Sequence, residues 1–309
     1  SSNICYNSSI DTNISDDKGL GAIYNTDIAT LVLNATSLTG NKSRLGGAIY
    51  NIGSLSADYK TKFTSNTAQK GGAIYNKSDK DIKIEGSSFS KNTADYGGAI
   101  YNDVNSNLQI KLYDYTYVSK GKEKHKYYNP VVSSNTAING AGVYNNGEIV
   151  SEKVTFSKNN ANNNSSNLTS DELDKVGNGG AIYNNGKLTV SNSSFSSNNA
   201  TTNIADVVED VSTSSTKYTT TTSIGGNGGA IYNISSDNLS ISNSTFTSNK
   251  SGMNGGAIAN DNENSDLNIS GSTFKSNSSL NKIVTKEYSV NNKTNKKSST
   301  KTVSSVYND

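Results

Sequence analysis

Cysteine, proline, histidine and tryptophan are almost missing from this 309-residue sequence, which has 1 Cys, 1 Pro, 1 His and no Trp. Because Cys5 is alone, no intrachain disulfide can form, and we expect it to be a buried strand residue, as free cysteines usually are. His125 has no second His or Cys near it in the sequence, so neither a zinc site nor a Ser-His-Asp triad can be assembled around it. The sequence therefore predicts no metal and no cofactor, and it places His125 on the surface.

Charge and long apolar runs are also scarce. Charged residues make up 17% of the chain, and 28 basic residues nearly balance 26 acidic ones. Arg44 is the only Arg, so bidentate recognition of phosphate is almost absent. A nucleic-acid-binding protein normally shows a basic excess, and we expect no nucleic acid as a partner. No apolar run approaches the ~20 residues of a membrane-spanning helix, and no secretory signal peptide is visible.

Hydrophobic residues reach only 32%, a level that is common in disordered chains, but here they recur at a fixed phase. The hexapeptide Gly-Gly-Ala-Ile-Tyr-Asn at residues 46–51 returns unchanged at 71–76, 97–102, 179–184 and 228–233. Variant copies stand at residues 20–25, 140–145 and 255–260, and a degenerate ninth copy stands at residues 303–308. Self-similarity at a period of a few tens of residues is typical of a solenoid.

Two further apolar segments follow each hexapeptide. The first alternates with a period of two, as in Leu188 and Val190, which indicates a short strand. The second is the motif Phe-x-x-Asn, as in Phe195 and Asn198. Three short strands in a coil of about 25 residues predict an all-β fold, a parallel β-helix in which equivalent residues of successive coils lie ~4.8 Å apart.

Stacking of the coils gives the repeated residues structural roles. We expect the Asn side chains to form two hydrogen-bonded ladders and the Phe rings to stack inside the coil. The predicted ladder residues are Asn51, Asn76, Asn102, Asn184 and Asn233 at one corner and Asn66, Asn92, Asn159, Asn198 and Asn249 at the other. The predicted core stack is Phe63, Phe89, Phe156, Phe195, Phe246 and Phe274. An outward stripe is predicted for Tyr50, Tyr75, Tyr101, Tyr144, Tyr183 and Tyr232.

Four insertions interrupt the regular coils, at about residues 113–130, 162–176, 201–226 and 278–302. The first falls between the second and third strands of its coil and is basic and aromatic. The other three follow a Phe-x-x-Asn segment, so we expect them to leave from one corner and to decorate one side of the rod. The whole chain, residues 1–309, is interpreted as a single β-helix domain.

The paired motifs Gly-Gly-Ala-Ile and Phe-x-x-Asn resemble the polymorphic outer membrane protein repeats of autotransporter passengers and related adhesin-like proteins. The resemblance extends from Gly21 to Asn277. It implies a right-handed parallel β-helix that is exposed on a cell surface and serves in adhesion or as a stalk. We therefore expect a secreted, extracellular protein with a structural or adhesive function, no enzymatic activity, and a host or cell-surface glycan or protein as its partner.

An enzymatic alternative is a β-helix lyase or hydrolase that acts on polysaccharides. Its candidate carboxylates lie in two insertions, as Asp171, Glu172 and Asp174 and as Asp206, Glu209 and Asp210. Catalytic carboxylates must be held about 5–10 Å apart, and acids in variable polar loops are more often solvated charge. Carboxylates on adjacent coils of one strand face would favour the enzyme.

The basic and aromatic segment at residues 120–128 has two interpretations. Its Tyr faces could stack on sugar rings while its Lys side chains attract an anionic partner, or the segment could be a hairpin that merely packs on the rod. The second interpretation is favoured. The Tyr stripe likewise has two interpretations: it could bind carbohydrate, or it could pack beneath the insertions.

The two ends of a β-helix expose unpaired strand edges, which invite association. No capping helix is predicted, and both termini read as degenerate coil segments. Ile4, Cys5 and Tyr6 at one end and Val306 and Tyr307 at the other are therefore candidates for self-association. Head-to-tail stacking would be heterologous and would build a filament; a fragment of a longer passenger is the alternative.

Overall fold

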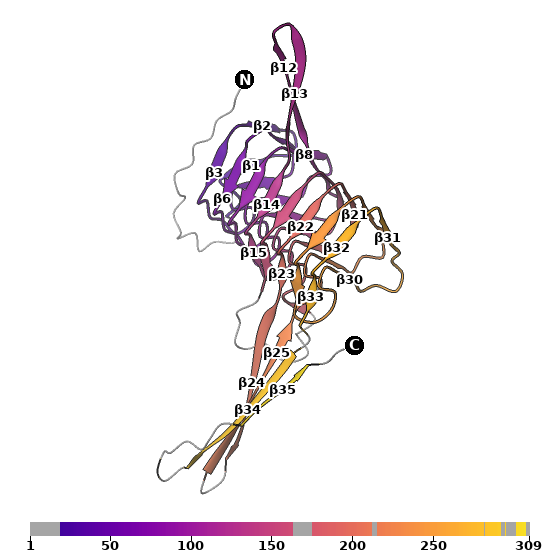
Figure 1. The fold of residues 1–309 in the computed structure, drawn as a ribbon. Coiled ribbons are helices and arrows are strands. Elements are labelled where there is room, and N and C mark those ends of the chain that lie inside the picture. The colour runs from indigo at the N-terminus through magenta and orange to yellow at the C-terminus, as the bar shows by residue number, and fades with distance from the viewer. Residues whose placement is uncertain are drawn as a thin grey trace.

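The structure, a computed structural model, describes residues 19–162, 175–211, 215–280, 282–291, 294 and 301–306. These residues form a parallel β-helix with two antiparallel appendages (Figure 1). Three 8-stranded parallel sheets run along the β-helix, so eight coils are stacked in register. This confirms the predicted fold class. In the ranges given, no helix is long and apolar enough to cross a membrane.

The Ile-Tyr-Asn segments form the first sheet. Each strand pairs with its equivalent in the next coil, as Ile49 does with Ile74. Gly46, which opens the segment, has a φ of 61°, and a Cβ on Gly47 would overlap the Gly72 carbonyl oxygen. The Gly pair is therefore required by the turn and by the close approach of the next coil. The strands are β1 (Ile23–Asn25), β4 (Ile49–Asn51), β7 (Ile74–Asn76), β10 (Ile100–Asn102), β16 (Val143–Asn145), β20 (Ile182–Asn184), β26 (Ile231–Asn233) and β30 (Ile258–Asn260).

The alternating segments form the second sheet. Their apolar residues point into the coil and their polar residues point outward, as in the exposed–buried alternation of Asp81–Glu85. This is the period-two pattern of a half-buried strand. The strands are β2 (Thr30–Asn34), β5 (Ser54–Asp58), β8 (Asp81–Glu85), β11 (Asn107–Lys111), β17 (Glu148–Glu152), β21 (Lys187–Ser191), β27 (Leu239–Ser242) and β31 (Leu267–Ser270).

The Phe-x-x-Asn segments form the third sheet and the corner that follows it. The residue before each ladder Asn adopts a left-handed conformation, for example Ser65 with a φ of 56° and Lys91 with a φ of 57°. Because this conformation is unfavourable for residues other than Gly, the ladder hydrogen bonds must offset its cost. The strands are β3 (Ser37–Thr39), β6 (Lys62–Thr64), β9 (Ser88–Ser90), β14 (Val131–Ser133), β18 (Thr155–Ser157), β22 (Ser194–Ser196), β28 (Thr245–Thr247) and β32 (Thr273–Lys275).

A fourth, narrow sheet was not predicted. It contains two-residue strands that follow the ladder Asn in the later coils, and isolated bridges such as that between Thr67 and Thr93 mark the same position in earlier coils. Two residues are too few to show a period-two pattern, so these strands could not be predicted. They are β15 (Thr136–Ala137), β19 (Asn160–Ala161), β23 (Asn199–Ala200), β29 (Lys250–Ser251) and β33 (Ser278–Ser279).

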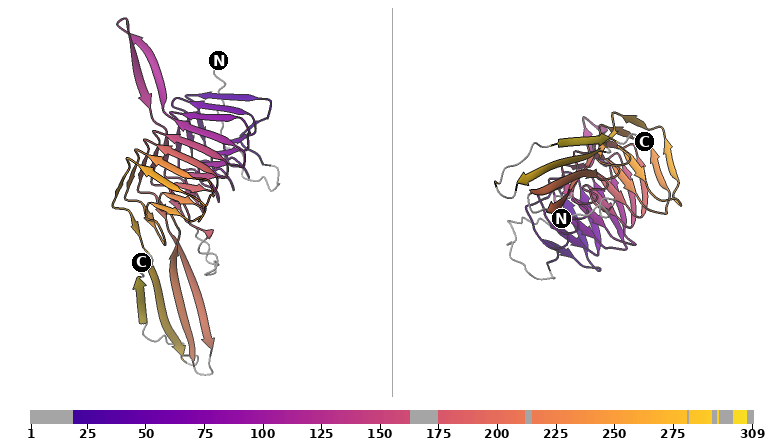
Figure 2. Two further views of the ribbon diagram at one scale, coloured as in Figure 1. Left: turned by 90° about the vertical axis from the view of Figure 1, so that its right-hand side faces the viewer. Right: turned by 90° about the horizontal axis from the view of Figure 1, so that it is seen from below.

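Two appendages project from the β-helix in opposite directions (Figure 2). One is the antiparallel hairpin of β12 (Tyr113–Ser119) and β13 (Lys122–Tyr128). The other is a 4-stranded antiparallel sheet, ordered β24-β25-β34-β35, with bounds Thr202–Val211, Ser215–Gly225, Lys282–Asn291 and Lys301–Val306. The insertions at 201–226 and 278–302 thus pair with each other. Sequence spacing could show their common corner but not this pairing.

The prediction for the C-terminal end was wrong. Residues 301–306 do not form a ninth coil, because β35 pairs antiparallel with β34, with Val306 opposite Lys282. Val306 therefore lies in the appended sheet and not at the end of the β-helix. Ile4, Cys5, Tyr6 and Tyr307, with residues 163–174 of the second insertion, lie outside the described residues.

Candidate functional site

Two Asn ladders run without interruption through all eight coils. In the ladder at the end of the first sheet, each side-chain amide donates to the amide oxygen of the next coil, as Asn51 does to Asn76 at 2.9 Å and Asn76 to Asn102 at 2.9 Å. In the ladder after the third sheet, Asn66 donates to Asn92 and Asn159 to Asn198, both at 3.0 Å. The structure places Asn51, Asn76, Asn102, Asn184, Asn233, Asn66, Asn92, Asn159, Asn198 and Asn249 in these ladders, all at 0% exposure. These residues hold the coils together and are not available to a ligand.

A third series of Asn residues was missed. Asn139, Asn178, Asn227 and Asn254 each precede a Gly of the hexapeptide, and the backbone N–H of each of the last three donates to the side-chain oxygen of the one before. Their position before the hexapeptide Gly in coils five to eight was a visible signal. They too are structural.

The Phe rings stack along the interior as a single column, with one break where Val132 replaces Phe. Ring centroids lie 4.5 Å apart for Phe63 and Phe89 and 4.7 Å apart for Phe156 and Phe195, with nearly parallel planes. Phe246 is fully buried, whereas Phe274 in the last coil is 44% exposed. Among the residues that the structure describes, Phe274 stacks on one side only, against Phe246 at 4.7 Å.

The Tyr side chains form a stacked column on the outer face of the first sheet, but their ring faces cover one another. Centroids of Tyr50 and Tyr75 are 5.2 Å apart, and those of Tyr75 and Tyr101 are 5.1 Å apart. Burial raises the pKa of Tyr101 and of Tyr183 to about 12. Only Tyr24 at the end of the column is largely open, at 48% exposure. The column therefore offers few free faces for stacking on a sugar.

The hairpin β12–β13 presents its aromatic and basic side chains to solvent. Its turn residues Lys120 and Gly121 have φ values of 54° and 70°, as a type I′ turn requires. Because side chains alternate across a strand, cross-strand partners share a face: Tyr115 lies opposite Lys126, and Tyr117 opposite Lys124. One face thus carries Tyr113, Tyr115, Tyr117, Lys122, Lys124, Lys126 and Tyr128, and we call it the aromatic-basic face.

The opposite face of the hairpin carries its acidic residues. His125 Nδ1 lies 2.9 Å from a carboxylate oxygen of Asp114, and its Nε2 lies 3.5 Å from Glu123. The two signs of charge are therefore separated by the ribbon: no carboxylate of the hairpin lies on the aromatic-basic face. An anionic molecule would be attracted to one face only.

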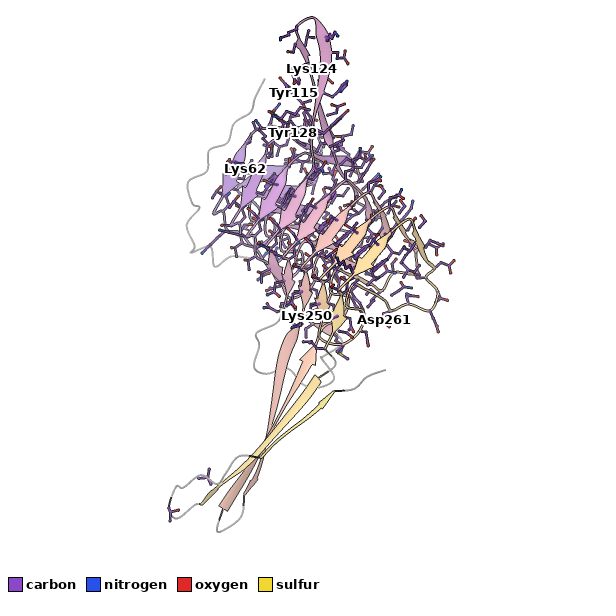
Figure 3. The ribbon with its side chains drawn as sticks, in the orientation of Figure 1. Lys62, Tyr115, Lys124, Tyr128, Lys250 and Asp261 are labelled. Carbon is purple, nitrogen blue, oxygen red and sulfur yellow. The ribbon has the colours of Figure 1, made fainter. Side chains whose placement is uncertain are left out.

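The base of the hairpin is anchored by a residue of the second coil. The ring of Tyr59 packs against Tyr113 and Tyr115, each at 5.5 Å, and edge-on against Tyr128 at 4.6 Å. Lys60 Nζ lies 4.7 Å from the Tyr59 ring centre. Hydrogen bonding by the Lys60 ammonium and the Tyr128 hydroxyl, followed by the Lys60 charge, lowers the pKa of Tyr59. Figure 3 shows Tyr128 near the base of the hairpin and Lys124 near its tip. The hairpin thus packs on the rod at its base only, which corrects the favoured interpretation of residues 120–128.

The candidate carboxylates that the structure describes lie in an insertion, as predicted, and not on the coils. Asp206, Glu209 and Asp210 belong to β24, outside the coils, and Asp171, Glu172 and Asp174 fall among the residues that the structure does not describe. Within the β-helix, Asp58 and Glu85 end adjacent strands β5 and β8, one coil apart. Burial, with the nearby Asp58 carboxylate, raises the pKa of Glu85. In the described ranges, no group of three or more His, Cys, Asp or Glu side chains could hold a metal.

A comparison with known protein families finds a match within the repeated segments. Residues 60–77, 86–103 and 243–261 match the Chlamydia polymorphic membrane protein repeat. Each match begins near the third-sheet strand of one coil and ends after the first-sheet strand of the next. No curated protein and no solved structure matches the chain. The chain is thus a parallel β-helix that carries repeats of the Chlamydia polymorphic membrane protein type.

Proposed function

We propose that this chain is a surface-associated structural and adhesive β-helix, which binds acidic glycans through the aromatic-basic face of its hairpin. The observation that carries the proposal is the separation of charge on the hairpin, with Lys122, Lys124 and Lys126 on one face and Asp114 and Glu123 on the other. The match to repeats of a membrane protein family supports a place at the cell surface.

The chemistry of the aromatic-basic face fits an acidic polysaccharide. Tyr117 is 38% exposed, so its ring can pack against the C–H face of a sugar. Tyr115 stacks between Tyr59 at 5.5 Å and Tyr117 at 5.8 Å, and it supports the Tyr117 ring from behind. The Lys ammonium groups are exposed and can approach carboxylate or sulfate groups at a spacing set by the strand.

Heparin, polygalacturonate and neutral dextran provide the test, with binding measured by calorimetry at several salt concentrations. We expect the two acidic polymers to bind and dextran not to bind this face. Replacing Lys122, Lys124 and Lys126 by Gln should weaken heparin binding about tenfold or more and flatten its salt dependence. Tyr115→Ala with Tyr117→Ala should weaken polygalacturonate binding without changing the net charge.

The matched control removes three Lys charges elsewhere on the β-helix, as Lys62→Gln, Lys153→Gln and Lys250→Gln, all at exposed positions (Lys62 and Lys250 are marked in Figure 3). This variant has the same net charge as the hairpin variant. Equal losses of heparin binding in both variants would mean that net charge alone attracts the polymer, and the proposal would fail.

A second candidate function is head-to-tail association into a filament. The last coil leaves Phe274 44% and Ile269 42% exposed, and β30, β31, β32 and β33 have no partner on their outer edge among the described strands. Such an edge can pair with the first coil of another copy. Electron microscopy over a concentration range tests this: long threads would support it, and isolated rods at every concentration would exclude it.

We propose that the chain binds and does not catalyse. The observation that favours the enzymatic alternative is the pair Asp58 and Glu85 on adjacent coils, one of them with a raised pKa. Lys83 and Lys111 stand beside Glu85 and offset its charge. Release of reducing ends from polygalacturonate, abolished in Glu85→Gln, would establish a hydrolase and overturn this part of the proposal.

A further inference from the structure

The turns that join the first and second sheets differ in length from coil to coil. In the fifth and sixth coils they are the short turns 146–147 and 185–186, both Asn-Gly. The preceding coil has the longer turn 103–106 and the following coil the longer turn 234–238. A recess of about 570 Å³ results, with the two short turns as its floor and the longer turns as its walls. We call it the polar groove.

Glycine makes the floor low. A Cβ on Gly186 would overlap the carbonyl oxygen of Gly147, and a Cβ on Gly147 would overlap that of Ser106. Only Gly therefore lets these turns stack directly on one another. The walls are separated by three coil spacings, about 14 Å between their backbones. This leaves room for one extended chain of small rings or residues.

The backbone groups of the floor are already used between coils. The N–H groups of Asn146 and Asn185 donate to the carbonyl oxygens of Asn102 and Asn145, at 2.8 Å each. The N–H groups of Glu148 and Lys187 donate likewise to Ser106 and Gly147. A peptide cannot add to the groove as a β-strand, because no strand edge is open there. Recognition must come from side chains.

Five of the 15 residues that line the groove are Asn, and its charged residues are Glu148, Lys187 and Asp237. The Asn185 amide donates to the Asn146 oxygen at 3.1 Å, and Asn146 donates to the Tyr101 hydroxyl at 2.8 Å. Since an amide has two donor hydrogens and an oxygen with two lone pairs, both keep capacity for a ligand. Lys187 and Glu148 form an ion pair at 2.9 Å. Asn105, Asn107 and Asn262 add further amides at the walls.

We infer that the polar groove binds an uncharged oligosaccharide. Sugar hydroxyls both donate and accept hydrogen bonds, as the facing amides do, and the internal ion pair leaves no unpaired Lys to attract an anion. Val104, which is 59% exposed on one wall, and Ile234 on the other can contact the C–H faces of the rings. This site is separate from the hairpin and does not depend on the adhesive function proposed for it.

Calorimetry with four neutral tetrasaccharides tests the inference: cellotetraose, maltotetraose, α1,6-mannotetraose and tetra-N-acetylchitotetraose. We expect at least one to bind with a Kd of about 1 mM or tighter. The double variant Asn146→Ala with Asn185→Ala should weaken that binding about tenfold or more. The hairpin variant without its three Lys charges should bind the same sugar unchanged.

The control is Asn199→Ala. Asn199 donates to Asn160 at 2.6 Å, which is the same kind of amide pair between the same two coils, but at another corner. The Asn199→Ala variant should bind the sugar with a Kd within twofold of that of the parent protein. Ser236→Phe fills the groove from an exposed wall position and should abolish binding without disturbing the coils, which keeps the test decisive if the double variant does not fold.

Three results would overturn the inference. The first is that none of the four neutral sugars binds. The second is that Asn199→Ala weakens sugar binding as much as the double variant Asn146→Ala with Asn185→Ala does. The third is displacement of the bound sugar by a blocked tetra-alanine peptide or by tetragalacturonate, which would identify the groove as a peptide or an acidic-sugar site.

Discussion

The side-chain amide of Asn92 donates to the side-chain oxygen of Asn135 at 3.0 Å, although 43 positions separate the two residues. Adjacent coils without an insertion bring ladder residues together at separations of 24 to 28. The hairpin between Tyr113 and Tyr128 therefore leaves the β-helix and returns to it without altering the ladder.

Removal of the hairpin should preserve the β-helix. A variant in which residues 113–128 are replaced by Gly-Gly should keep the exchange protection of the Asn135 N–H, which donates to the Asn159 side chain at 3.1 Å. We expect Tm to change by only a few degrees, since few buried contacts are lost, while heparin binding disappears. Hydrogen exchange followed by NMR checks the first outcome. Loss of protection at Asn135 would show that the hairpin is part of the fold.

Asn92→Ala should destabilise the protein by roughly 2–4 kcal/mol, because it leaves buried polar groups of two neighbouring coils unpaired. Asn92 donates to the Phe63 carbonyl oxygen at 3.1 Å and accepts from both the backbone and side chain of Asn66 at 3.0 Å. Denaturant unfolding measures the change. Asn107→Ala removes only one exposed bond, to Asp81, and should cost less than about 0.5 kcal/mol. Similar losses in both variants would contradict a structural role of the buried ladder.

Phe156→Ala should cost about 3–5 kcal/mol, as large cavities in a closed core do. Phe156 is at 0% exposure and its ring stacks on Phe195 at 4.7 Å. Phe274→Ala is the matched comparison, because the same side chain is 44% exposed in the last coil. It should cost about 1–2 kcal/mol. If the two variants lost equal stability in thermal unfolding, Phe274 would be covered in solution, as head-to-tail association predicts.

Alkaline titration should test the burial of Tyr101 and Tyr183 in the Tyr column. Burial raises the pKa of Tyr101 and Tyr183 to about 12, so above pH ~10 the folded protein retains protons that the unfolded chain loses. Folding stability should therefore fall as the pH rises from about 10 towards 12. Absorbance at 295 nm, compared between the parent and the variants Tyr101→Phe and Tyr183→Phe, should show these two residues ionising only near pH 12 or on unfolding. Ionisation of both near pH 10 in the folded protein would contradict their burial.

The sequence alone determined the β-helix. The sequence predicted the period, the two Asn ladders and the Phe column. This was possible because a solenoid places the same residue types at the same position in every coil, so the pattern for each role recurs several times. Isolated residues such as Asp58 and Glu85 have no such repetition. Their position one coil apart on the second sheet was therefore missed, although both end alternating segments.

The tertiary structure decided what lies outside the repeat. Tyr side chains point outward as predicted, but only stacking at 4.4–5.3 Å between coils shows that most of their faces cover one another. The pairing of β25 with β34 joins residues 215–223 to residues 283–291, and no local pattern specifies such a long-range antiparallel register. The polar groove likewise depends on turn lengths in four neighbouring coils. The coil can be predicted from the sequence because equivalent positions recur in every coil. A surface that depends on differences between coils can be recognised only after the coils are stacked.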